Sequence, residues 1–282
     1  MTSGPEKTSP SAFEVREMNY TDFIALLKET NRCPGGKKTI RRIRELIHID
    51  NKTKILDVGS NTGFTSLELG RITPAHISGI DISESCIAES KVLLSEDIDD
   101  VRSRIQFQVA SAYDIPFPDN EFDIVMVGGA TGFMDDKRKA ITEYLRVLKS
   151  WGFLVLSQLT YHSQPPTDVV SEVSNIIGLQ IKPMNKNDWI SIVVDITNDF
   201  ELYLDESHTL SPRTDEKIKK YIDYFINKDH IKVMPDDVKE AIRERWSNIL
   251  KVFNENHKYL GYDIMIFRKR PILEEPELFL SN

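Results

Sequence analysis

The chain has 282 residues, 40% of them hydrophobic, which is enough to bury one large core or a core with a smaller cap. No apolar run approaches the roughly 18 residues that span a bilayer, so we expect no membrane segment. The net charge of −8 makes a nucleic-acid partner unlikely, because backbone phosphates require a basic surface.

The N-terminal residues 1–12 are predicted to be a disordered tail, because they are rich in Ser, Thr, Pro and Lys and lack the apolar stretch of a secretory signal. Helices are predicted over 21–29 and 38–49, with a loop from Asn31 to Gly36 between them. Cys33 and Cys86 have neither disulfide nor zinc spacing, which fits a cytoplasmic protein.

The run from Ile55 to Phe64 is the most informative part of the chain. A short apolar strand ends at an acid, Asp57, and is followed by a turn of small residues and a helix start. Glycines let the backbone approach a ligand closely, and we expect the helix N-terminus to offer free N–H groups. Asp81 ends the next apolar strand, where its carboxylate can accept hydrogen bonds from a ribose. This pattern predicts a nucleoside-bearing cofactor at the carboxyl ends of parallel strands.

The spacing of the turn distinguishes between cofactors. A dinucleotide fingerprint is G-x-G-x-x-G, whereas Gly59 and Gly63 here are separated by three residues, with Asn61 in the middle. Asp57 would repel a pyrophosphate but favours a cationic ligand. A nicotinamide-dependent reductase is therefore not expected. The motif resembles the first motif of the class I S-adenosylmethionine (SAM) methyltransferases.

Two further segments resemble that family, in its order and spacing. One runs from Ala110 to Val125 and contains an adenine-bracketing turn and a Phe-Asp strand; the other runs from Tyr144 to Leu154. Together the matches cover about residues 38–160. The resemblance implies that SAM and its product S-adenosylhomocysteine bind at the turns after the first four strands, at Asp57, Gly59, Ser60, Asn61, Gly63, Asp81, Ile82, Ser111, Ala112, Val127 and Gly128.

The chain departs from the family pattern in three places. Ser111 replaces the usual aspartate that contacts adenine. Ser150 and Trp151 replace a Pro-Gly pair in a turn. No polar side chain stands directly after the fourth strand, where Val127 is followed by two glycines and an alanine.

Apolar runs and helical periodicity alternate through the first half of the chain and predict a doubly wound α/β fold. Strands are expected near 54–58, 76–81, 104–109, 122–127 and 152–158, and helices near 63–71, 83–96 and 135–149. The resemblance implies a Rossmann-like, mostly parallel sheet whose last strand is antiparallel.

The second half is expected to hold helices near 165–180 and 188–196, a sixth strand at 200–204 and a last strand at 260–268. Two strong helical patterns lie between these strands, one starting at the Ser211-Pro212 pair and one at Pro235. We therefore expect a SAM-binding core with N-terminal lid helices over 13–210, a helical cap over 211–257, and the last core strand with a tail over 258–282. Helices that extend the core elsewhere remain the alternative to a cap.

Methyl transfer demands little of the protein beyond alignment and exclusion of water, although an acceptor hydroxyl also needs a base. Tyr161 and His162, just after the fifth strand, are the candidate catalytic residues. No metal site is expected, because no metal-ligand spacing occurs. The sequence predicts a SAM-dependent methyltransferase that acts by in-line displacement on an oxygen or nitrogen of a small molecule. An RNA methyltransferase and a SAM-binding protein without transferase activity remain alternatives, and the oligomeric state is left open.

Overall fold

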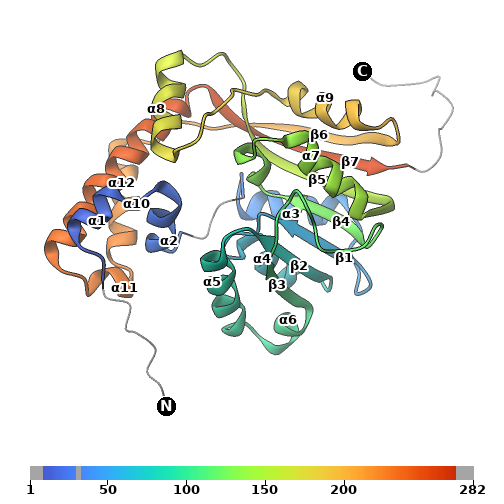
Figure 1. Cartoon of the computed structure of the whole chain (residues 1–282), viewed down its shortest axis with the longest axis horizontal. Helices are drawn as coiled ribbons and strands as arrows, with labels where there is room; N and C mark the ends of the chain where they lie inside the picture. The colour runs from blue at the N-terminus through green and yellow to red at the C-terminus, as the bar shows by residue number, and fades with distance from the viewer. Residues whose placement is uncertain (1–8, 30–32, 271–282) are drawn as a thin grey trace. The chain divides into compact units, whose positions relative to one another are not determined.

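A computed structural model of the chain describes residues 9–29 and 33–270 (Figure 1). Most of the expected tail, residues 1–8, lies outside the described residues. The chain forms two compact units. One contains a sheet and comprises residues 33–161, 184–208 and 261–270 of the described chain; the other is helical and comprises residues 9–29, 162–183 and 209–260.

The first unit is built on one seven-stranded sheet in the order β3-β2-β1-β4-β5-β7-β6. The first five strands pair in parallel, and the last strand runs antiparallel, as predicted. The strands are β1 Lys54–Val58, β2 His76–Asp81, β3 Ile105–Val109, β4 Phe122–Val127, β5 Leu148–Tyr161, β6 Phe200–Thr209 and β7 Leu260–Lys269.

The parallel pairing places the carboxyl ends of the central strands side by side at one edge of the sheet. Val58 of β1 lies between Ile80 of β2 and Val127 of β4, and Val127 lies opposite Leu156 of β5. β5 is longer than expected, because it begins at Leu148 and runs to Tyr161. The first four strands therefore end together, while β5 continues past them.

Helices cover the sheet because its strands are apolar on both faces. Tyr144 of α7 and Trp189 of α9 share a buried core with Val125, Leu156 and other inward residues of β1, β4, β5 and β7. The helices α4 and α5 contact β2 and β3. The helices of this unit are α3 Lys37–Leu46, α4 Phe64–Ile72, α5 Glu84–Ser95, α6 Asp99–Arg104, the 3₁₀ turn η1 Ala130–Phe133, α7 Lys137–Val147 and α9 Lys186–Ile196.

The second unit has its own aromatic core. Trp246 packs edge-on against Phe23 and Phe225, with ring centroids 5.9 and 6.0 Å apart. This core includes residues near the N-terminus, so the unit is larger than the 211–257 segment alone. Its helices are α1 Ala12–Glu17, α2 Tyr20–Leu27, α8 Thr167–Ile177, α10 Asp215–Ile226, α11 Asp229–Lys232 and α12 Asp236–Asn256.

Two helix starts differ from expectation. α1 begins at Ala12, the last residue of the expected tail, because Ser11 and Glu14 form a capping box. The prediction that α10 starts at the Ser211-Pro212 pair is wrong: Thr214 caps the helix by accepting a hydrogen bond from the Lys217 amide. No described helix is both long and apolar enough to cross a bilayer.

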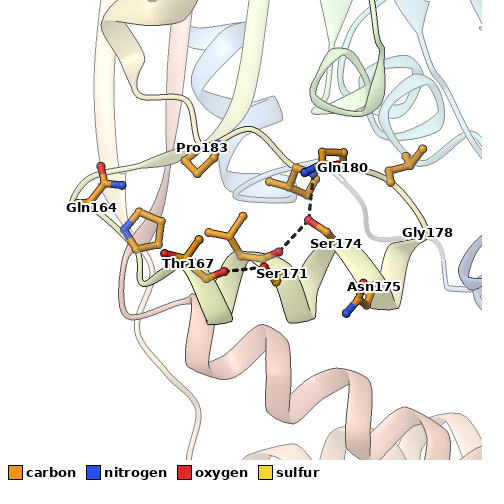
Figure 2. A pocket seen from close by; sticks show the side chains of 12 residues that line it. Gln164, Thr167, Ser171, Ser174, Asn175, Gly178, Gln180 and Pro183 are labelled. Carbon is orange, nitrogen blue, oxygen red and sulfur yellow. Dashed lines mark hydrogen bonds between the residues drawn. The ribbon is translucent and has the colours of Figure 1, made fainter.

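The helical unit also carries an open hollow of about 630 Å³ between α8 and residues 178–183 (Figure 2). Its polar lining is largely engaged within the chain. Ser171 and Ser174 donate to carbonyl groups of their own helix, and the Ile181 amide donates to the Ser174 hydroxyl at 3.0 Å. The hollow contains none of the residues expected to bind the cofactor.

Candidate functional site

The turn after β1 is held in an unusual backbone conformation. Gly59, Asn61 and Gly63 all have positive φ angles, of 69°, 49° and 89°. A side chain at Gly59 would also place its Cβ 2.1 Å from the Cβ of Ala130, so glycine is required there both for conformation and for space. The small residues of the sequence motif therefore shape the turn itself.

The amides of the turn itself are bonded within the chain. The amides of Gly59 and Ser60 donate to the Ile80 carbonyl, and that of Gly63 donates to the Ser60 carbonyl. Asp81 accepts from the Asn61 amide at 2.8 Å and from the Ser83 amide at 2.9 Å. These bonds fix the turn against the end of β2. The first amides of α4 are a separate set, and Gly63 at the N-cap offers them no side-chain hydrogen bond.

Two hydroxyl side chains of the turn, by contrast, have no hydrogen-bond partner in the part of the chain that the structure describes. The hydroxyls of Ser60 and Thr62 are buried and have no hydrogen-bond partner among the described residues. Each oxygen of the Asp81 carboxylate keeps a second lone pair, since each has one recorded amide donor. Ile82 follows Asp81 and is 77% exposed, although it is apolar. Polar groups that lack partners beside an exposed apolar side chain are what a nucleoside, with its hydroxyls and flat base, would satisfy.

Asp57 is buried in the turn rather than facing solvent. The Ser66 hydroxyl donates to its carboxylate at 2.7 Å, and the Ser66 backbone also bonds to it. Burial raises the pKa of Asp57 to about 7; the Ser66 bonds oppose this rise and the nearby charge of Asp81 adds to it. Asp57 thus anchors the start of α4, and a cationic ligand nearby would favour its ionised form. Ser66 was not predicted, since nothing in the sequence singles out its hydroxyl.

The loop from Cys33 to Gly36 packs over the end of β4. The Pro34 carbonyl accepts hydrogen bonds from the hydroxyls of Thr39, at 2.6 Å, and Ser157, at 3.3 Å. A Cβ placed on Gly128 would lie 3.5 Å from the Cys33 sulfur, and one placed on Gly129 would lie 3.4 Å from Pro34. Burial, with a contribution from Asp57, raises the pKa of the Cys33 thiol to about 12, so the sulfur stays protonated and is not a nucleophile.

The turn after β3 is closed by short contacts. The Ala110 amide donates to the Asp81 carbonyl at 3.0 Å, which ties this turn to the end of β2. The Ser111 hydroxyl accepts from the Tyr113 amide at 3.1 Å, and Ser111 and Ala112 are half-buried. All predicted cofactor residues therefore lie in turns or strand ends at one edge of the sheet.

The two candidate catalytic residues are Tyr161, the last residue of β5, and His162, which follows it. Val127 pairs with Leu156, and Tyr161 is five residues further on, about 16 Å at ~3.3 Å per residue. Tyr161 is half-buried and its amide donates to the Met184 carbonyl, while the His162 amide donates to the Tyr259 carbonyl. His162 belongs to the helical unit. Because β5 extends past β4, Tyr161 lies beyond the strand ends that carry the predicted cofactor turns.

Comparisons with known proteins agree with this geometry. Residues 56–156 match the Methyltransferase domain family. An uncharacterized protein of Haemophilus influenzae is 27% identical over 84% of this chain and 93% of its own length. The ubiquinone/menaquinone biosynthesis C-methyltransferase UbiE of Geobacter sulfurreducens is 31% identical over 46% of this chain, which spans half of the UbiE length. The crystal structure of MccD protein aligns with a TM-score of 0.73 at 26% identity, over 85% of this chain and all of that one.

A mostly parallel sheet with glycine turns at its carboxyl edge is the architecture of enzymes that bind a nucleoside cofactor. Together with these matches, it identifies the chain as a member of the class I SAM-dependent methyltransferase family. Its cofactor is SAM.

Proposed function

We propose that this methyltransferase acts on a small molecule and transfers the methyl group to an oxygen or nitrogen by direct in-line displacement. The observation that carries the proposal is the contact of the Cys33–Gly36 loop with Gly128 and Gly129, which covers the end of β4. A covered strand end leaves room for a compact acceptor, whereas a polymer needs an open and basic groove.

The residues at the strand ends support the same conclusion. Asp57 and Asp81 stand at the ends of β1 and β2, and the charged residues between β3 and β4 are all acidic: Asp114, Asp119 and Glu121. Acidic turns attract a cation and repel phosphates. SAM supplies a methyl group on a positively charged sulfur, and the chain must bind it, align the acceptor and exclude water.

The positions proposed for cofactor contact are the eleven residues of the strand-end turns predicted from the sequence. We propose that Asp81 binds the ribose and that Ile82 packs on the adenine. Asp57 acts on the methionine end through its charge, because its direct hydrogen bonds go to Ser66. Tyr161 and His162 remain the proposed bases for an acceptor hydroxyl.

We further propose that the 211–257 helices control acceptor choice and do not bind the cofactor. They belong, with residues 9–29 and 162–183, to a compact unit that has its own aromatic core. We propose the cytoplasm as the place of reaction, since Cys33 and Cys86 are both buried free thiols.

The test is incubation of the protein with methyl-labelled SAM and a fractionated metabolite extract, with total RNA as a parallel acceptor. Label in a small-molecule fraction supports the proposal, and the chemistry of the product identifies the methylated atom. Label on a carbon atom, as the name of UbiE suggests for that protein, would revise the atom but keep the acceptor class. Label in RNA, or tight S-adenosylhomocysteine binding without any transfer, would overturn the proposal in favour of one of its alternatives.

A further inference from the structure

Gln158 on β5 has a side chain whose polarity the fold does not explain. The residue is only 1% exposed, and its amide nitrogen Nε2 has no hydrogen-bond partner among the described residues. A buried amide without a partner is unfavourable, because it has lost its bonds to water and gained none in return. Its neighbours at 154–156 are Leu, Val and Leu, so an apolar residue would fit the strand pattern better.

Gln158 lies close to the turn after β4. It is two residues beyond Leu156, the partner of Val127 at the end of β4. A Cβ placed on Gly132 of η1 would lie 3.8 Å from the Gln158 Oε1 atom. The carboxamide therefore borders the turn after β4, where Val127 is followed by two glycines and an alanine, with no polar side chain.

The two segments that flank this carboxamide carry no charge themselves, although the buried carboxylate of Asp263 on β7 accepts from Thr160. Residues 127–134 and 153–160 contain no Asp, Glu, Lys, Arg or His. The hydroxyls of this region already have partners, since Thr131 bonds to Tyr144 and Thr160 bonds to Asp263. The ring of Phe133, next to Gly132 in η1, is 49% exposed. An unused amide on a strand that contacts η1, which itself carries an exposed aromatic ring, fits a neutral ligand that has an oxygen on a ring.

We propose that Gln158 binds the methyl acceptor and that the acceptor is a neutral phenol-type molecule whose oxygen bonds to the Gln158 amide. This inference rests on the proposed small-molecule function and narrows it. It assigns to β5 the polar contact that the end of β4 lacks. Gln158 orients the acceptor, and the methyl group passes from sulfur to the phenol oxygen while the phenol proton leaves to solvent or to a base.

The test compares Gln158→Met with Gln108→Met. Gln108 is a matched control, because its amide nitrogen is also buried without a partner but lies on β3, four strands away and about 19 Å across the sheet. Methionine has a similar volume and no hydrogen-bonding amide. Transfer from labelled SAM is measured to catechol, as the phenol probe, and to ethanolamine, as the amine probe, alongside S-adenosylhomocysteine affinity and the denaturation midpoint.

We expect wild-type transfer to catechol and none to ethanolamine. Gln158→Met should raise the KM for catechol about tenfold, with S-adenosylhomocysteine affinity within twofold and an equal or higher denaturation midpoint. Gln108→Met should leave the KM for catechol unchanged. A purely structural Gln158 would predict unchanged KM for both variants, and that result would overturn the assignment. Transfer to ethanolamine but not to catechol would overturn the assignment of a phenol acceptor, and so would transfer to extract components but not to catechol. If no small molecule were labelled, the proposed function itself would be wrong.

Discussion

Replacement of Asp57 by asparagine tests the electrostatics of the glycine turn. Asparagine keeps an oxygen that can accept from Ser66 but removes the titration. Burial raises the pKa of Asp57 from 3.8 to about 7, a difference of about 3 pH units, or about 4 kcal/mol at ~1.36 kcal/mol per unit. The folded protein binds this proton more tightly than the unfolded chain does. The carboxyl group of Asp57 therefore does not reduce the free energy of unfolding below pH 4, and it reduces that free energy progressively as the pH rises through 7.

We therefore expect the stability of Asp57→Asn, relative to wild type, to increase between pH 4 and pH 8 by about 4 kcal/mol, with a slope of at most ~1.4 kcal/mol per pH unit. Urea denaturation at several pH values measures this difference. Glu143→Gln is an opposite-sign control, because hydrogen bonds from Arg146 lower the pKa of Glu143. That variant should lose stability relative to wild type as the pH rises through the acidic range.

Cofactor binding gives a second readout of the same group. A cationic ligand favours ionised Asp57, so wild-type affinity for SAM should increase as the pH rises from 6 to 8, and the asparagine variant should lose this dependence. A pH-independent difference in stability between Asp57→Asn and wild type would refute the reasoning. It would mean that the carboxylate is already ionised in the folded protein at low pH.

Three further predictions concern the cofactor turns and the helical unit. Asp81→Ala should weaken S-adenosylhomocysteine binding by about 1.5–3 kcal/mol in calorimetry, the usual loss for charged hydrogen bonds; unchanged affinity would remove Asp81 from the site. Ser111→Asp should tighten binding or leave it unchanged, because a carboxylate accepts from the adenine amine more strongly than a hydroxyl does, and a large loss would show that another turn holds the adenine. Tyr224 is 64% exposed on α10, so Tyr224→Ala should alter acceptor turnover while S-adenosylhomocysteine affinity holds. Protection of α10 from hydrogen exchange by S-adenosylhomocysteine, as strong as that of the glycine turn, would contradict this separation of roles.

The sequence determined the architecture of the sheet because its signals are local. Apolar runs that end at Asp57 and Asp81 predict buried parallel strands, and the glycines at 59 and 63 predict the tight turn between strand and helix. Such signals depend on neighbouring residues and on backbone sterics, which act in the same way in any surrounding structure. The cofactor class followed from the same few residues.

The tertiary structure decided which groups are free to act. The amides of Gly59 and Ser60 bond to the end of β2, whereas the buried hydroxyls of Ser60 and Thr62 have no partner among the described residues. The length of β5 depends on its pairing with neighbouring strands. Because β5 is long, Tyr161 lies beyond the end of β4 and Gln158 lies close to η1. Burial of Asp57 under the start of α4 raises its pKa, and no local pattern encodes that environment. These properties arise from contacts between residues far apart in the chain, which a sequence pattern does not specify.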